Sequence, residues 1–317
     1  NIPYGSGTHL SDVAMCMPIF SEGELIAVSV NKAHWTEVGG KDPGSWTTDS
    51  TEIYQEGIQF PAVKLYEESV ANESLIDVIR ANVRLPDMSL ADMHAQTASL
   101  RVAGRRVQEV IQKYGRLAVE ETIRWYMDYA DQLVQRELEK LPKGSFEAED
   151  WIDGDGLTDD PIPVRVKVTI DEERFLIDYT GTAPQTRGPV NCTLPATISA
   201  ARKVFLGVIN PHLAVNEGCF RRLDIVVPRG TVFHATHPAP TSIYWDSMIF
   251  AEDLVCKALA PHMPDRLIAG HFLSTCGLVL SVRRDDQRTV ILVEPQAGGW
   301  GAGKLKDGER GLVASSD

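Results

Sequence analysis

Residues 13–30 read VAMCMPIFSEGELIAVSV, two apolar runs joined by a short polar stretch that contains a glycine. The runs at 13–20 and 25–30 have the length of β-strands, and SEGE at 21–24 is typical of a tight turn. The sequence therefore predicts a β-hairpin near the start of the chain.

The apolar period becomes helical between about residues 73 and 141. Apolar residues recur at i, i+3, i+4 and i+7 from Val107 to Tyr114, and a second apolar face continues after a break at Gly115. Pro142 ends the pattern. The segment predicts two or three packed helices.

Beyond residue 150 the pattern returns to strands. Residues 164–170 (VRVKVTI) alternate strictly, and a turn leads to residues 175–179 (FLIDY), which predicts a second hairpin. We expect further elements at 198–208 (helix), 223–227 (strand), 249–259 (helix) and 290–293 (strand). Because helices and strands alternate irregularly, the sequence predicts an α+β fold, with β-hairpins and mixed sheets and a central helical segment.

We divide the chain into two parts. Residues 1–145 would hold a metal-site hairpin and the helical segment, and residues 146–317 would form a mixed β/α region. The sequence starts at Asn1 without a methionine and ends abruptly at Asp317. We therefore expect a fragment that is truncated at both ends.

Composition excludes several classes of partner. The 317 residues include 31 Lys and Arg against 44 Asp and Glu, a net charge of −13, which argues against nucleic acid and anionic membranes as partners. No apolar stretch approaches the roughly 18 residues that span a bilayer. The five cysteines lie far apart and form no C-x-x-C pair, so we expect a cytoplasmic protein without disulfides.

Two short motifs flank the first predicted hairpin: His9-Leu-Ser-Asp12 and His34-Trp-Thr-Glu37. Each places a carboxylate three residues after a histidine. Two imidazoles and two carboxylates form a mixed nitrogen and oxygen set that suits a divalent Zn, Mn or Fe ion. We therefore predict a metal site with His9, Asp12, His34 and Glu37 as ligands.

The register of the predicted hairpin decides whether the side chains of the two motifs can meet. Side chains alternate between the faces of a strand, and across a turn of two or four residues opposed positions have numbers with an odd sum. His9 and His34 satisfy this condition, so we expect both on one face. Asp12 would point away in a continued strand, and a turn near residues 5–8 is needed to bring it round. The alternative is that these are ordinary histidines satisfied by nearby carboxylates.

Two other motifs imitate known binding loops. Residues 298–304 (GGWGAGK) fit the phosphate-loop pattern G-x-x-x-x-G-K, but Leu305 stands where a Ser or Thr hydroxyl is needed. The turn-rich stretch that follows predicts no helix to hold a phosphate, so we interpret the motif as a structural loop. Residues 153–160 (DGDGLTDD) lack the Gly and Glu spacing of a calcium loop and predict an acidic turn.

The opening run NIPYGSGTHLSD at 1–12 resembles the N-D-P-Y-x-G-G-T-H-L-P-D signature of the hydantoinase B/5-oxoprolinase family. Further matches follow in order along the chain: NKAHWTEVGG at 31–40, TEIYQEG at 51–57 with PAVKL at 61–65, RGPVNC at 187–192, NEGCF at 216–220 and AGGWGA at 297–302. The resemblance covers essentially the whole sequence.

The resemblance implies one subunit of an ATP-dependent, hetero-oligomeric enzyme. In such enzymes a separate hydantoinase A-like, ATP-binding subunit phosphorylates a lactam, imide or ketone-enolate oxygen, and a divalent metal lies in the B-like subunit. The expected function is the metal-bearing subunit of a hydrolase of cyclic amides such as hydantoin, N-methylhydantoin or 5-oxoproline. The alternatives are a subunit of an ATP-dependent acetone or acetophenone carboxylase, and a non-catalytic assembly subunit.

The resemblance also bears on individual residues. His9 and Asp12 match the H and D of T-H-L-P-D, and His34 matches the first His of the family's A-H-H-x-D-V-G-G. Trp35 stands in place of the second His, and Glu37 replaces the usual Asp. The family draws a further carboxylate ligand from a segment upstream of residue 1. No catalytic residue is assigned.

Overall fold

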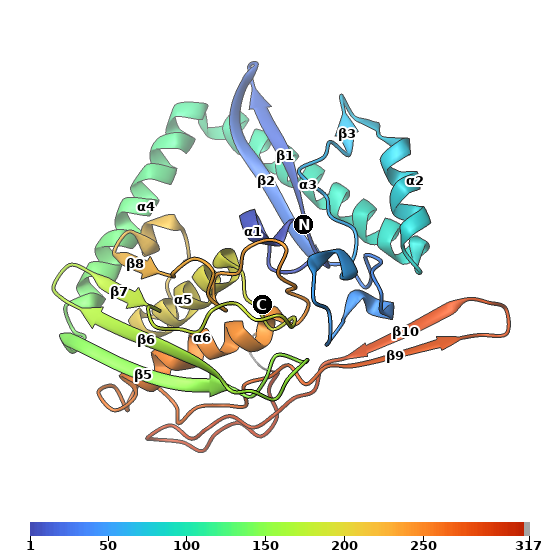
Figure 1. Cartoon of the computed structure of the whole chain (residues 1–317). Coiled ribbons are helices and arrows are strands. Elements are labelled where there is room, and N and C mark those ends of the chain that lie inside the picture. The colour runs from blue at the N-terminus through green and yellow to red at the C-terminus, as the bar shows by residue number, and fades with distance from the viewer. Residues whose placement is uncertain (314–317) are drawn as a thin grey trace.

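The computed structural model describes residues 1–313 and has helices and strands in mixed order (Figure 1). In chain order the elements are α1 (Pro3–Ser6), β1 (Asp12–Ser21), β2 (Glu24–His34), η1 (Pro43–Ser45), η2 (Ile53–Gln55), β3 (Tyr66–Glu67), β4 (Val70–Ala71), α2 (Glu73–Asn82), α3 (Pro86–Tyr114), α4 (Arg116–Leu138), β5 (Gly144–Ile152), β6 (Ile162–Ile170), β7 (Phe175–Asp178), α5 (Leu194–Ile209), η3 (Glu217–Phe220), β8 (Leu223–Val226), α6 (Tyr244–Leu259), β9 (Leu278–Arg283) and β10 (Thr289–Glu294). The predicted α+β class is confirmed.

The first predicted hairpin is confirmed as β1 and β2. Its two-residue turn consists of Glu22 and Gly23, both at positive φ (51° and 82°), the backbone geometry that matches the twist of a hairpin. A bulge between Ile19 and Phe20 then shifts the register. Beyond the bulge opposed positions have an even sum, so our expectation of an odd sum is wrong at the base of the hairpin.

The helical segment packs against this hairpin and connects it to the rest of the molecule. Gly115, at φ 83°, breaks the predicted segment into α3 and α4, as the sequence predicts. In Figure 1, α3 runs behind the hairpin, and α4 returns along the left side to the four-stranded sheet. Residues from the hairpin, its following loop, α2 and α3 form one buried cluster: Leu10, Val13, Trp35, Val38, Ile53, Ile76, Ile79, Val83 and Met93.

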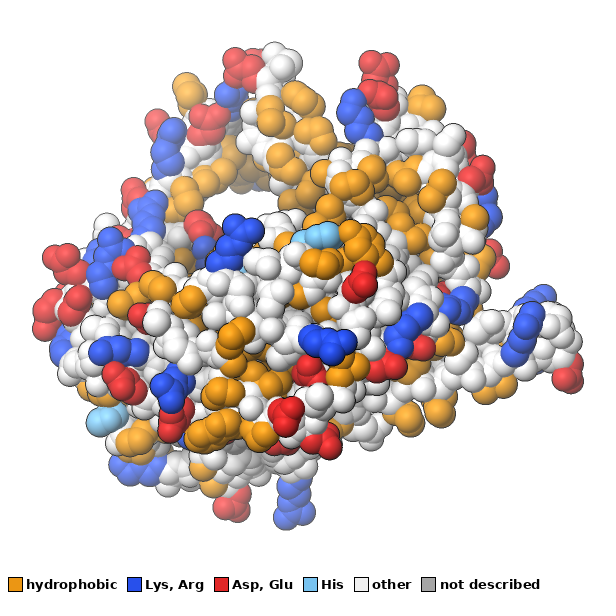
Figure 2. Space-filling model, in the orientation of Figure 1, with side chains coloured by type: hydrophobic (Ala, Val, Ile, Leu, Met, Phe, Trp, Pro, Cys, Tyr) orange, Lys and Arg blue, Asp and Glu red, His pale blue; other side chains and the backbone are white. Residues whose placement is uncertain are grey.

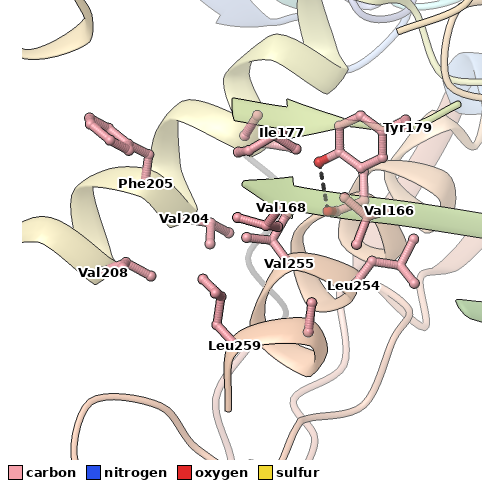
Figure 3. Close-up of a cluster of buried hydrophobic side chains, with 14 of the residues drawn as sticks. Val166, Val168, Ile177, Tyr179, Val204, Phe205, Val208, Leu254, Val255 and Leu259 are labelled. Carbon is pink, nitrogen blue, oxygen red and sulfur yellow. Dashed lines mark hydrogen bonds between the residues drawn. The ribbon is translucent and has the colours of Figure 1, made fainter. Parts of the chain in front are cut away.

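The second part is built on a sheet with the order β5-β6-β7-β8. The β6–β7 hairpin is confirmed, and β7 pairs with β8 in parallel, so the sheet is mixed. Alternate residues of β6 are buried, as its sequence pattern predicts, and α5 and α6 cover that face (Figure 3). Tyr179 donates a hydrogen bond to the carbonyl of Ala251 (2.9 Å), which connects the sheet side to α6.

The larger buried cluster begins within α4, at Ala130, and extends to Met263. Our division at residues 145 and 146 stays a prediction. The two parts meet at residues 237–242, where Ile53 N–H donates to the carbonyl of Pro238 (3.0 Å) and Thr47 N–H to Ser242 Oγ (2.9 Å). These bonds bring the start of α6 to the base of the first hairpin.

The sequence analysis missed β5 and β9. The partly buried face of β5 carries Ala148 and Asp150 while Trp151 is exposed, so its alternation is weak. β9 pairs with β10 in a hairpin that projects from the body, with hydrophobic side chains along one edge (Figure 2). None of the helices within residues 1–313 combines the length and apolar character needed to cross a membrane.

Residues 153–160 and 298–304, the two stretches whose sequences resemble binding loops, form turns. In the acidic turn, Asp155 accepts N–H bonds from Leu157 (2.9 Å), Thr158 (3.0 Å) and Gly188 (2.9 Å). In the glycine-rich loop, Gly303 bridges to Lys306, and the described residues after Lys304 contain no helix. Both findings agree with our interpretation.

Lys304 provides a test of the loop. Its amine pairs with Asp265 at the surface (2.8 Å), and such pairs contribute about 0–1 kcal/mol. In the complex of the full-length protein with the ATP-binding subunit, we expect Lys304→Ala to leave the affinity for MgATP, measured by calorimetric titration, within about twofold of the wild type. A hundredfold loss would restore the phosphate-loop interpretation.

Candidate metal centre

The centre forms where the first hairpin opens at its base. β1 begins only at Asp12, so His9 lies in the preceding turn, where Asp12 N–H donates to its carbonyl (3.3 Å). Asp12 lies directly opposite His34, the last residue of β2. The register therefore places Asp12 and His34 on one face, and the turn, rather than strand alternation, brings His9 to them.

The two imidazoles face each other through the same ring nitrogen. His9 Nε2 lies 3.1 Å from His34 Nε2, and the ring centroids are 5.0 Å apart. His9 is 2% exposed, whereas His34 is exposed. Two nitrogen lone pairs repel at this separation unless a proton or a cation lies between them. The pair can therefore share one positively charged species at the surface.

Asp12 lies behind His9. Its Oδ2 atom is 3.1 Å from His9 Nδ1 and 3.1 Å from Lys32 Nζ, and it also accepts from the hydroxyls of Thr8 and Tyr244. Burial acts to raise the pKa of this carboxyl, but the hydrogen bond and charge of His9 and the charge of Lys32 outweigh it and hold the pKa well below its usual range. Asp12 therefore stays ionised.

This placement fixes the tautomer of His9. A proton on Nδ1 is held by Asp12, so Nε2 carries a lone pair directed at His34. Histidine ligands commonly donate their second ring N–H to a carboxylate in this way. Asp12 Oδ2 contacts Nδ1 of this ring, and a ligand role for Asp12 stays a prediction. Within residues 1–313 no group of three or more His, Cys, Asp or Glu side chains is arranged to hold a metal ion.

Glu37 is engaged elsewhere. Its carboxylate is completely buried and accepts hydrogen bonds from Arg84 Nη1 (2.5 Å) and from the backbone N–H groups of Arg84 and Leu85 (2.5 and 3.1 Å). The structure thus brings together His9, Asp12 and His34, and it sets Glu37 in an ion pair below them. The ligand role that we predicted from the sequence for Glu37 is untested, and its bonds to Arg84 and Leu85 favour a structural role instead.

Three aromatic side chains surround the pair, and the sequence analysis missed them. The ring of Tyr244 lies 5.0 Å from that of His9, Trp245 meets His9 edge-on at 5.8 Å, and Trp46 meets His34 at 6.4 Å. Trp46 and Trp245 also contact each other (4.8 Å). Tyr244 and Trp245 start α6, far from the histidines in sequence, and no local pattern points to them.

The family model for hydantoinase B/oxoprolinase matches residues 1–316. This chain belongs to that family. The motifs from which we inferred the resemblance include both histidines of the centre, so the family assignment and the geometry concern the same residues.

Three relatives show how similar this chain is to other proteins of the family. The B subunit of a putative D-/L-hydantoinase from Pseudomonas sp. (strain NS671) is 33% identical over 97% of this chain and 54% of its own length. The crystal structure of the ATP-dependent caprolactamase from Pseudomonas jessenii superposes with a TM-score of 0.91 at 25% identity, over 100% of this chain and 55% of that one. The acetophenone carboxylase delta subunit from Aromatoleum aromaticum (strain EbN1) is 25% identical over 75% of this chain and 35% of its own length. The chain thus spans about half, or less, of the length of these relatives.

The histidine pair predicts how metal content responds to mutation. His9→Ala or His34→Ala in the full-length protein should lower bound Zn, Mn or Fe at least tenfold, because each removes one of the two facing nitrogens. Elemental analysis after dialysis measures this, with His262→Ala as a control remote from the centre. Wild-type metal content in both variants would contradict a metal site here.

Glu37 gives a second, separable prediction. We expect Glu37→Gln to lower the free energy of unfolding by roughly 2 kcal/mol, since it breaks a buried charged contact with Arg84, and to leave metal content unchanged. Denaturant titration and elemental analysis on the same preparation measure both. A fall in metal content as large as that of His9→Ala would instead make Glu37 a ligand.

Proposed function

We propose that this chain is part of the metal-bearing subunit of an ATP-dependent hydrolase that opens cyclic amides of the hydantoin, N-methylhydantoin or 5-oxoproline type. The observation that carries the proposal is the His9–His34 pair, with Nε2 atoms 3.1 Å apart and the Asp12 carboxylate behind His9. Similarity to one chain of a putative hydantoinase and to caprolactamase supports a cyclic amide as the substrate class.

Each residue of the centre has a separate role. His9 and His34 would hold a divalent Zn, Mn or Fe ion through their Nε2 atoms, and such an ion, when bound, supplies Lewis-acid chemistry. Asp12 holds the Nδ1 proton of His9 and keeps that ring in the tautomer that can ligate. Tyr244, through its contacts with both His9 and Asp12, fixes the ring against rotation.

The aromatic side chains bound one side of the histidine pair. Trp46 and Trp245 lie edge-on against His34 and His9 and contact each other. We propose that they help to hold the two imidazoles in place.

The activation step requires a partner. An unactivated lactam is a poor electrophile, and phosphorylation of its oxygen creates a good leaving group. The glycine-rich loop of this chain lacks the hydroxyl and, within the described residues, the helix that hold a phosphate. We propose that a hydantoinase A-like, ATP-binding subunit forms a hetero-oligomer with this chain. The exposed side chains of Tyr114, Leu117 and Trp125 at the α3–α4 elbow support an interface.

The second candidate function is ATP-dependent ketone carboxylation, which the similarity to the acetophenone carboxylase delta subunit favours. It would use the same centre and the same kind of partner with a different acceptor. We propose a cytoplasmic location for either enzyme, supported by the five cysteines, which are all free.

Mixing experiments test the proposal. We expect the purified full-length subunit alone to turn over none of hydantoin, 5-oxoproline and acetophenone, with or without ATP. Turnover should appear only after an A-type subunit is added. Product and ADP are measured together by chromatography. Robust ATP-dependent turnover by this polypeptide alone would contradict the two-subunit mechanism, and bicarbonate-dependent consumption of acetophenone would favour the carboxylase.

A further inference from the structure

Glu56 is a buried carboxylate that the proposed chemistry does not use. It is 2% exposed, and its donors are two hydroxyls and two backbone amides: Ser50 Oγ (2.8 Å), Thr241 Oγ1 (3.5 Å), Thr241 N–H (2.9 Å) and Ser242 N–H (2.9 Å). Burial raises the pKa of Glu56 to about 7, against the lowering effect of these hydrogen bonds. A buried carboxylate held by neutral donors is costly, so its position calls for a reason.

The two backbone amides belong to the corner that precedes α6. Asn191 holds the same corner from the other side, since its Nδ2 donates to the carbonyl of Pro240 (3.1 Å). Three consecutive residues, 240–242, therefore have backbone groups bonded to buried side chains. Glu56 comes from the first part of the chain and Asn191 from the second, so the corner joins the two parts.

The residues directly after this corner form the wall of the candidate metal centre. Tyr244 lies two residues beyond Ser242; its ring packs on His9, and its hydroxyl donates to Asp12 Oδ2 (3.4 Å). Trp245 contacts both His9 and Trp46. A shift of the corner would therefore move the first turn of α6 relative to His9.

We propose that Glu56 is a positioning residue: through the 240–242 corner it holds Tyr244 against His9 and Asp12, and Asn191 assists from the opposite side. The inference deepens the proposed function, because the centre that it positions is the His9–His34 pair. Its central test does not require that a metal binds.

The first experiment measures the packing of His9 in metal-free, full-length protein. Modification by diethyl pyrocarbonate is followed residue by residue with mass spectrometry, and we expect His9 to be protected in the wild type because it is 2% exposed. We expect Glu56→Gln to speed modification of His9 at least fivefold, since the variant loses the negative charge and places an N–H donor where one carboxylate oxygen accepts from the N–H and hydroxyl of Thr241. Asn191→Ala should act in the same direction from the other side of the corner.

Two controls separate positioning from general destabilisation. Glu52→Gln alters an exposed carboxylate in the same motif and should leave His9 protected. Alkylation of Cys219, which is completely buried in η3, reports wider opening and should stay at the wild-type rate in Glu56→Gln. Unchanged His9 modification in both Glu56→Gln and Asn191→Ala would overturn the proposal, and so would a parallel rise at His9 and Cys219.

A double variant tests whether Glu56 acts on His9 through Tyr244. If Glu56 acts through Tyr244, the combination of Glu56→Gln and Tyr244→Phe should expose His9 no more than the stronger single variant does. Multiplied effects in the double variant would overturn this route.

Zinc affinity, measured by competition with a chelating dye, connects the inference to function. We expect Glu56→Gln to weaken it about tenfold, the size of effect known for residues that orient ligands, with no change in Glu52→Gln. Wild-type affinity in Glu56→Gln would overturn the role of Glu56 in the centre. A wild-type protein that binds no zinc would overturn the metal proposal and leave the His9 protection result standing.

Discussion

One buried carboxylate, that of Asp12, is the group on which the centre depends. It is 4% exposed, and its Oδ2 atom is approached by Thr8, His9, Lys32 and Tyr244. An ionised carboxylate is tolerated at such depth only when charges and hydrogen-bond donors replace the water that it loses. These groups come from the turn before β1, from β2 and from the start of α6, so all three must be in place before the charge is satisfied. Once satisfied, Asp12 fixes His9 in the tautomer that faces His34. The electrostatic requirement of a single side chain thus couples the two parts of the fold to the geometry of the histidine pair.

Much of the fold was predictable because its signals are local. The turn of the first hairpin, the break at Gly115 and the strict alternation of residues 164–170 each lie within a few residues, and each appears in the structure as predicted. The meeting of the histidines was predicted for a wrong reason. A bulge at Ile19 changes the register, and a one-residue shift moves every following side chain to the other face. The turn that carries His9 compensates for it. Nothing in an apolar run marks where a bulge falls, so strand parity alone could not settle this point.

The remaining features depend on contacts between distant residues. Tyr244 and Trp245 belong to an apolar helix start, which the sequence predicts only as buried surface, and their approach to His9 follows from the path of residues 237–242. The bonds of Glu56 to Thr241 and Ser242 span more than half of the chain. Periodicity reports which face of an element is buried and carries no information about the element it meets. The resemblance to a family located Glu56 within a motif, but only the folded chain gives that carboxylate its partners.

Two of the departures from the family pattern, Trp35 and Glu37, can be explained by the contacts that these side chains make in the structure. Trp35 follows His34 and points to the opposite side, where its indole is 2% exposed and donates to Gln96 of α3 (2.7 Å). Glu37 reaches Arg84 at the start of the same helical layer. Trp35 therefore attaches the base of the hairpin to α3, and Glu37 attaches it to the two residues just before α3. Their replacement of His and Asp changes how the hairpin is supported and leaves the facing Nε2 atoms intact.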